Sequence, residues 1–165
     1  MNYFTIIEAV RFAILCGLVN MSHNFLGAFK KLYHLENFDP PFDLGLNFFG
    51  QRLFGKSATW WGLVVSLLVG AVIQIFYSPV GIIIGFGCFF GHVLGSFIKR
   101  RFHIQDGGYL PLVDHGNYII FTGAIVFFLG YLSLASYLLS ILLILAIHPI
   151  FCFVGYKLGI RDRKL

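Results

Sequence analysis

Long apolar runs separated by polar segments are the main pattern along the chain. Five stretches approach the roughly 20 residues that a helix needs to cross a hydrocarbon layer of about 30 Å. They cover approximately residues 3–21, 59–77, 80–98, 117–132 and 134–156. The pattern therefore predicts an all-α integral membrane protein with five transmembrane helices, in one domain over residues 1–165.

The first apolar stretch carries two charges, Glu8 and Arg11. They interrupt the run that a signal peptide would need, and no basic start or small-residue cleavage site frames it. We expect a retained span, with the two side chains on one helical face where they pair or face the other helices.

The basic residues are distributed unevenly along the chain. An odd number of spans places three polar segments on the same side of the membrane: residues 23–58, 99–116 and 157–165. Of the 12 Lys and Arg residues, 11 fall in these segments. Because basic residues concentrate in cytoplasmic loops, we expect a multi-pass protein of the cell membrane with its N-terminus outside and its C-terminus cytoplasmic.

The composition agrees with a membrane location. The chain is 58% hydrophobic and 12% charged, against roughly 45–50% and about 25% for soluble domains. A net charge of +5 is too small to coat a nucleic-acid groove, so we expect no nucleic acid polymer as a partner.

Cys16, Cys88 and Cys152 lie in apolar runs without CxxC spacing, and we interpret them as small hydrophobic residues without a metal or redox role. The six histidines are scattered.

Glycines recur at every fourth position in the third stretch. Gly81 and Gly85 form one such set, and Gly87, Gly91 and Gly95 form another. Small residues at this spacing make a groove along a helix, which either lets a neighbouring helix pack closely or leaves room for a lipid chain.

The end of the third stretch has the highest density of candidate functional residues. His92, Ser96 and Lys99 are spaced i, i+4 and i+7, so they share one helical face, and Arg100 and Arg101 follow directly. The three cations either set topology and contact anionic lipids, or form a clamp for phosphate groups.

A second polar group follows in the next segment, at Asp106, Asp114, His115 and Asn117. A carboxylate such as Asp114, close to basic side chains at the start of a membrane helix, is either a magnesium ligand or an ion-pair partner of Lys99 or Arg100.

Five segments together resemble one known family. They are Pro41–Gly45, Arg52–Gly55 leading to Thr59-Trp60, Gly91 with Gly95–Arg101, Pro111–Asp114 and Tyr156–Asp162. This order resembles the archaeal CDP-archaeol synthase family, membrane cytidylyltransferases related to the CDP-diacylglycerol synthases. The resemblance implies five membrane helices and transfer of CMP from CTP to the phosphate of a glycerol lipid, with Mg²⁺ and release of pyrophosphate.

The resemblance also implies site residues. Catalysis would involve Asp43, Asp114 and Lys99, and the phosphate or lipid would be held by Ser96, Lys99, Arg100 and Arg101. Asp114 is the metal candidate, while His92 and Asn117 occupy positions where the family has carboxylates. Ala58 and Trp61 replace two cations. Two functions therefore remain open: an active transferase acting on CTP and a lipid phosphate, or a catalytically silent relative that binds a lipid or a protein partner.

Overall fold

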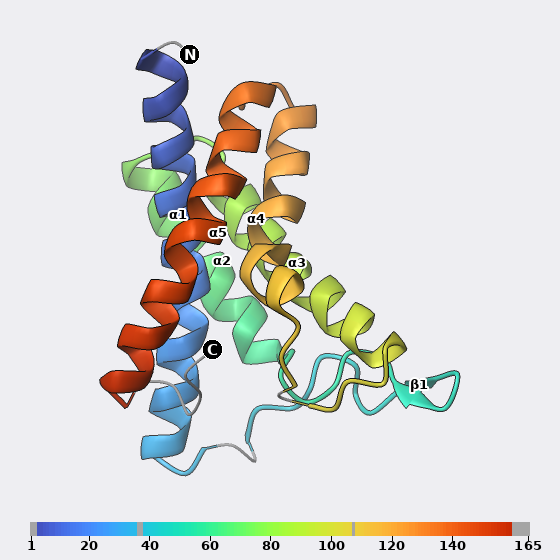
Figure 1. Cartoon of the computed structure of the whole chain (residues 1–165). Helices are drawn as coiled ribbons and strands as arrows, with labels where there is room; N and C mark the ends of the chain where they lie inside the picture. Colours follow the sequence, from blue (N-terminus) through green and yellow to red (C-terminus); the bar gives the residue numbers. More distant parts are fainter. Residues whose placement is uncertain (1–2, 36–37, 107, 160–165) are drawn as a thin grey trace.

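Five helices and one short hairpin make up the computed structural model of the chain, which describes residues 3–35, 38–106 and 108–159. The helices are α1 (Tyr3–Leu32), α2 (Trp60–Phe76), α3 (Gly81–Arg101), α4 (Pro111–Phe128) and α5 (Leu134–Lys157). The hairpin pairs β1 (Asn47–Phe48) with β2 (Gln51–Arg52) in the segment between α1 and α2. The helices pack side by side in one bundle, and the hairpin projects from one end (Figure 1). The predicted all-α class is therefore confirmed.

Three of the described helices, α1, α3 and α5, are long and apolar enough to cross a membrane. Helix α2 is apolar but has only 17 residues. Large apolar side chains also face outward, including Phe4 at 79%, Ile75 at 74% and Phe128 at 84% exposure, as expected where lipid surrounds the helices. The protein is thus a multi-pass membrane protein, whereas crossing by all five helices remains a prediction.

Two helix boundaries differ from the sequence-based ranges. Helix α1 continues to Leu32, through residues expected to open a polar loop at position 23. No proline stops it, and residues 22–32 stay amphipathic, with Phe25 and Phe29 exposed. Helix α4 runs over Pro111–Phe128 instead of 117–132, because Pro111 lies in its first turn, where a missing N–H costs nothing.

The glycines of α3 serve helix packing. A Cβ at Gly85 would lie 2.3 Å from the carbonyl oxygen of Ser66 in α2, and one at Gly91 would lie 2.6 Å from the Cα of Tyr118 in α4. Both distances are too short for any side chain. The glycine sets therefore let α2 and α4 approach α3 from two sides, which confirms the packing interpretation.

The two long connections lie at the same end of the bundle. The segments between α1 and α2 and between α3 and α4, together with the last turn of α5, lie opposite the short α2–α3 and α4–α5 connections (Figure 1). Most of the predicted basic face is thus gathered at one end. Arg161, Arg163 and Lys164 lie outside the described residues, and the compartment that this end faces remains a prediction.

Candidate functional site

A polar cavity of about 280 Å³ lies where α1, α3 and α4 meet the start of α2. Its lining from α1, the segment before α2 and the first turn of α2 is His23, Asn24, Leu26, Lys30, Ser57, Ala58, Thr59 and Gly62. Its lining from α3 and α4 is Phe89, His92, Ser96, Lys99, Asp114 and Asn117. The helical face predicted from the spacing of His92, Ser96 and Lys99 does line one site, and it meets Asp114 and Asn117 there.

Lys99 and Asp114 form an ion pair across this cavity. The Lys99 Nζ is 2.6 Å from Asp114 Oδ1 and also donates to the Gly108 carbonyl at 3.3 Å. The other carboxylate oxygen, Asp114 Oδ2, accepts the N–H of Leu110 at 2.7 Å. Of the two interpretations of Asp114, the ion pair is the arrangement seen.

A second lysine reaches the cavity from α1. Lys30 pairs with the buried Asp39, whose other oxygen accepts the N–H of Trp61 at 3.2 Å. From the sequence, Lys30 was interpreted only as one of the basic residues that set the topology. The spacing of His23, Leu26 and Lys30, at i, i+3 and i+7, could have indicated that Lys30 lines the site. These residues share one helical face because α1 extends to Leu32.

Two histidines form the inner wall of the cavity. The rings of His23 and His92 have their centroids 4.8 Å apart. His23 Nε2 lies 2.5 Å from Ser66 Oγ and 3.2 Å from the Gly62 carbonyl oxygen. His92 Nε2 lies 2.8 Å from Asn20 Oδ1. Both side chains are therefore held by neighbouring protein groups, and His23 is a site residue that the sequence analysis did not select.

The donor set of the cavity does not fit Mg²⁺. Mg²⁺ favours carboxylate, phosphate and water oxygens in octahedral geometry, yet Asp114 is the single carboxylate among the described lining residues. Asn117 Oδ1 already accepts the Tyr118 N–H at 2.6 Å, and the His92 imidazole suits softer metals. The residues present can bind an anion through ammonium and hydroxyl donors, but they do not make a hard-cation site.

Asp43 lies away from the cavity and anchors the loop before α2. Its carboxylate accepts the N–H groups of Gly45, Phe54 and Gly55, each at 3.0 Å, and pairs with Arg52 Nη2 at 2.5 Å. Burial alone would raise the pKa of Asp43, but these hydrogen bonds outweigh it and lower the pKa below the ordinary 3.8. The adjacent Phe42 packs with Phe54 against the buried Ala58 and Phe89.

The two arginines after Lys99 contact protein groups. Arg100 is buried, pairs with Asp106 at 3.1 Å and donates to the Gln105 carbonyl at 3.0 Å. Arg101 donates to the carbonyls of Phe48 at 2.5 Å and Arg52 at 3.0 Å, and its guanidinium stacks over the Phe97 ring. Neither lines the cavity, so the predicted three-cation clamp divides into one lysine at the site and two arginines that hold the surrounding loops.

An apolar groove of about 570 Å³ adjoins the polar cavity along α1 and α2. Its lining comprises Ser22, Phe25, Leu26, Ala28, Phe29, Leu32 and Val65. Leu26 also lines the polar cavity, so this residue borders both spaces. A ligand with a polar head and an apolar chain could occupy both.

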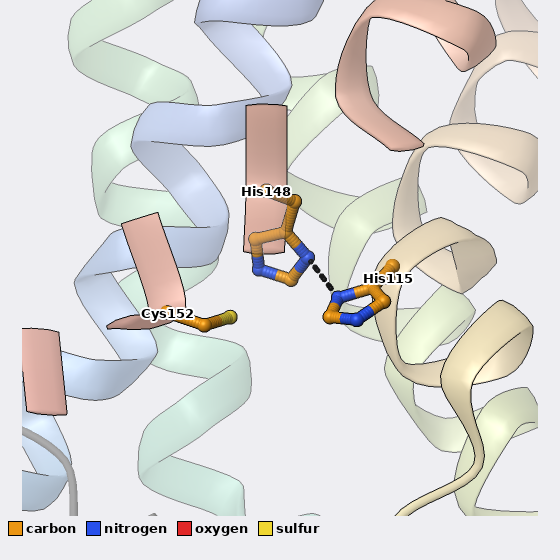
Figure 2. A group of neighbouring side chains, drawn as sticks. All are labelled: His115, His148 and Cys152. Atoms are coloured by element: carbon orange, nitrogen blue, oxygen red, sulfur yellow. Dashed lines mark hydrogen bonds between the residues drawn. The ribbon is translucent and has the colours of Figure 1, made fainter. Parts of the chain in front are cut away.

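The structure brings together two of the histidines that look scattered in the sequence, with Cys152 beside them. His115 of α4 meets His148 and Cys152 of α5, with one ligand atom from each residue within 4.8 Å of the others (Figure 2). His148 and Cys152 are four residues apart on one helix, a spacing that the sequence analysis did not consider. Among the described residues, all three cysteines are free thiols.

Comparison with known proteins identifies clear relatives. A family model described as CarS-like, CDP-archaeol synthase, matches residues 77–164. The CDP-archaeol synthase of Staphylothermus marinus is 36% identical over 128 residues, covering 70% of this chain and 73% of the relative. That of Sulfolobus acidocaldarius is 34% identical over 124 residues, covering 68% of this chain and 75% of the relative.

A solved structure shares the fold. It is described as an intramembrane enzyme for archaeal membrane lipid biosynthesis, and it aligns with a TM-score of 0.67 at 22% identity over 88% of this chain and 93% of its own. At this identity the likeness supports the fold alone.

Proposed function

The chain belongs to the CDP-archaeol synthase family, and from this premise we propose that it binds the phosphate of a glycerol lipid in the polar cavity without transferring CMP to it. The observation that carries this proposal is that Leu26 borders both a cavity with cationic side chains and an open apolar groove. A glycerol lipid phosphate has the same division between an anionic head and apolar chains.

The head group would be bound by donors on three elements. Lys99 and Lys30 supply ammonium groups, and Ser96 and Thr59 supply hydroxyls. Two of the three protons on Lys99 Nζ are directed to Asp114 and Gly108, which leaves a donor for a phosphate oxygen. Ser96 is buried on α3, so a phosphate bound there would be shielded from water. Charge-assisted hydrogen bonds are stronger in such a water-excluded site.

The absence of transfer is inferred from the donor set. CMP transfer brings two anions together. The family resemblance implies that Mg²⁺ neutralises the negative charge that accumulates during this step. His92 and Asn117 stand at two expected carboxylate positions and are hydrogen-bonded to Asn20 and Tyr118. Ala58 and Trp61 remove two cations. These four changes weaken triphosphate and metal binding more than binding of a single lipid phosphate.

An active transferase is the second candidate. It is favoured by one specific observation, the convergence of Asp114, Lys99 and Ser96 in one cavity, and by relatives named CDP-archaeol synthase at 34–36% identity. Under this alternative CTP and Mg²⁺ would enter the same cavity. Under either proposal we place the cavity on the cytoplasmic side, with five membrane crossings and the N-terminus outside, because of the basic residues at that end.

Lipid binding to the purified protein tests the proposal. The probes are a diacylglycerol phosphate and a dialkylglycerol phosphate, each compared with the same lipid without phosphate. We expect saturable binding of the phosphate forms. Ser96→Ala should weaken it about tenfold, since a hydrogen bond to a charged group contributes roughly 1.5 kcal/mol or more.

Lys99→Met should weaken binding further, because it removes a charge from the cavity. Lys56→Met is the matched control, since Lys56 is exposed at the same end and does not line the cavity. Equal binding of lipids with and without phosphate, or unchanged affinity in both Ser96→Ala and Lys99→Met, contradicts the proposal.

A further inference from the structure

Two imidazoles and one thiol meet between α4 and α5, next to the candidate site but separate from it. His115 and Cys152 are buried, at 6% and 2% exposure. The Nδ1 atoms of His115 and His148 face one another at 2.9 Å, and the Cys152 side chain points toward the same space (Figure 2). Imidazole and thiolate together are the ligands that Zn²⁺ takes in proteins.

Local backbone structure places these side chains. His148 and Cys152 are separated by four residues on α5, so they lie one turn apart on the same face. Pro149 lies between them within the helix and lacks the N–H that would bond to Leu145, which loosens the helix at this turn. His115 enters from the first two turns of α4, whose start is fixed by Pro111.

The outward-facing nitrogens of both histidines have partners. His115 Nε2 is 2.5 Å from the Tyr109 hydroxyl, and His148 Nε2 is 3.3 Å from Asn20 Nδ2, whose amide can turn to present its oxygen instead. Metal-binding histidines characteristically donate their other N–H to such a group, which fixes the ring orientation and the tautomer. The cluster thus has three candidate ligands, a supporting contact from Tyr109, and a second one from Asn20 once its amide turns.

We propose that His115, His148 and Cys152 bind a Zn²⁺ ion that joins α4 to α5. The proposal does not rest on lipid phosphate binding or on any Mg²⁺ at the polar cavity, although the two sites are linked through Asn20. A small cavity of about 90 Å³, lined by Asn20, Asn24, His148 and Cys152 among others, borders the cluster. It provides space for a water molecule as the fourth ligand, since three protein ligands and one water are a common zinc arrangement.

The distances require only a modest adjustment. Tetrahedral Zn²⁺ places two nitrogens about 3.3 Å apart and a nitrogen and a sulfur about 3.6 Å apart, given bond lengths of roughly 2.0–2.1 and 2.3 Å. The two Nδ1 atoms are 2.9 Å apart, and one candidate ligand atom from each of the three residues lies within 4.8 Å of the others. The imidazoles would part by about 0.4 Å, and the sulfur would move closer to them.

Zinc at this site would also influence the candidate site through Asn20. The amide of Asn20 spans His148 Nε2 at 3.3 Å and His92 Nε2 at 2.8 Å. If His148 binds the metal through Nδ1, its Nε2 carries a proton and needs an acceptor. Asn20 would then turn its oxygen to His148 and its NH₂ to His92, so that the His92 Nε2 becomes an acceptor.

Metal titration of the full-length protein tests this proposal. The protein is purified in detergent, freed of any polyhistidine tag and stripped with a chelator. In the Cys16→Ala/Cys88→Ala background Cys152 is the sole cysteine. We expect one equivalent of Co²⁺ to bind with a thiolate-to-cobalt charge-transfer absorption, and Zn²⁺ to displace it. This double variant also serves as the parent and control for the ligand variants.

Ligand variants then assign the site. Cys152→Ala and His148→Ala should each weaken Zn²⁺ binding by more than the roughly 10–100-fold that loss of a supporting partner costs, and Tyr109→Phe should fall within that range. Lack of Co²⁺ binding in the parent, binding without thiolate absorption, or retained affinity in Cys152→Ala overturns the proposal. The parent spectrum is decisive even if a ligand variant fails to fold.

Discussion

Asp43→Asn separates a structural role of this residue from the catalytic role suggested by the family resemblance. Asp43 is 2% exposed, and its carboxylate accepts three backbone N–H groups as well as the Arg52 guanidinium. The substitution keeps its size but turns one acceptor oxygen into an NH₂ donor. Each carboxylate oxygen accepts two of the four hydrogen bonds. Whichever oxygen is replaced, two hydrogen bonds are therefore lost, and their two N–H donors then face an NH₂ group, which is itself a donor.

The size of the effect follows from these contacts. A hydrogen bond to a charged group contributes roughly 1.5–3 kcal/mol. Because Arg52 remains 25% exposed, we take the lower limit for both lost bonds and expect the free energy of unfolding to fall by about 3 kcal/mol. For a chain of this size that corresponds to a decrease of about 6–12 °C in Tm.

The assay is thermal unfolding in detergent at several pH values. The folded-state pKa of Asp43 lies below the ordinary 3.8. The carboxylate therefore stabilises the protein fully above that ordinary value, and its contribution is lost as the pH falls through the folded-state pKa. The Tm difference between wild type and Asp43→Asn should stay constant from neutral pH to about pH 5 and shrink below about pH 4.

Two results would refute this reasoning. An unchanged Tm combined with lost lipid binding would place Asp43 in the functional site. A Tm difference that persists unchanged into strong acid would show that the carboxylate charge is not what stabilises the loop. Asp106→Asn is a useful comparison, because Asp106 is exposed, accepts the Lys56 N–H at 3.2 Å and pairs with Arg100 at 3.1 Å. It accepts fewer backbone N–H groups than Asp43, so its loss should lower Tm less.

Three further predictions concern packing, the basic cluster and topology. Gly91→Ala should destabilise the protein by about 1–3 kcal/mol, because its Cβ would meet the Tyr118 backbone. Gly17→Ala is the control, since a Cβ there has nothing within 4 Å, and it should leave the Tm nearly unchanged. Equal Tm values for the two variants would contradict close α3–α4 packing. Arg101→Met should speed proteolysis of the β1–β2 hairpin and leave lipid phosphate affinity within about threefold, whereas a phosphate clamp predicts a loss of tenfold or more for a charged contact. A cysteine at exposed Lys56 in a cysteine-free background should react with a membrane-impermeant reagent only after the cells are opened, and labelling of intact cells would reverse the proposed topology.

The fold was largely predictable because apolar runs and glycine spacing are local properties. Besides the shifted start of α4, the main difference was in helix α1. Residues 22–32 contain enough polar side chains to look like a loop, although His23 and Lys30 among them line a cavity inside the protein. Their periodicity is visible in the sequence, but its meaning depends on neighbours contributed by α3 and α4.

The candidate site was predictable only where one helix supplied several residues. His92, Ser96 and Lys99 follow from helical spacing alone. The separation of Lys99 from Arg100 and Arg101 could not be predicted in this way. The carbonyls of Phe48 and Arg52 that bind Arg101 come from a hairpin about 50 residues earlier. The cluster of His115 with His148 and Cys152 likewise depends on the packing of α4 against α5, which no local pattern specifies.

Incubation of the purified protein with labelled CTP, Mg²⁺ and a glycerol lipid phosphate, followed by measurement of both bound lipid and CDP-lipid, tests the central claim most directly. The account predicts saturable binding of the lipid phosphate and no CDP-lipid above that of a protein-free control, with a family relative as the positive control. Formation of CDP-lipid by the wild-type protein, abolished by Asp114→Asn, would contradict the account and establish the chain as an active transferase.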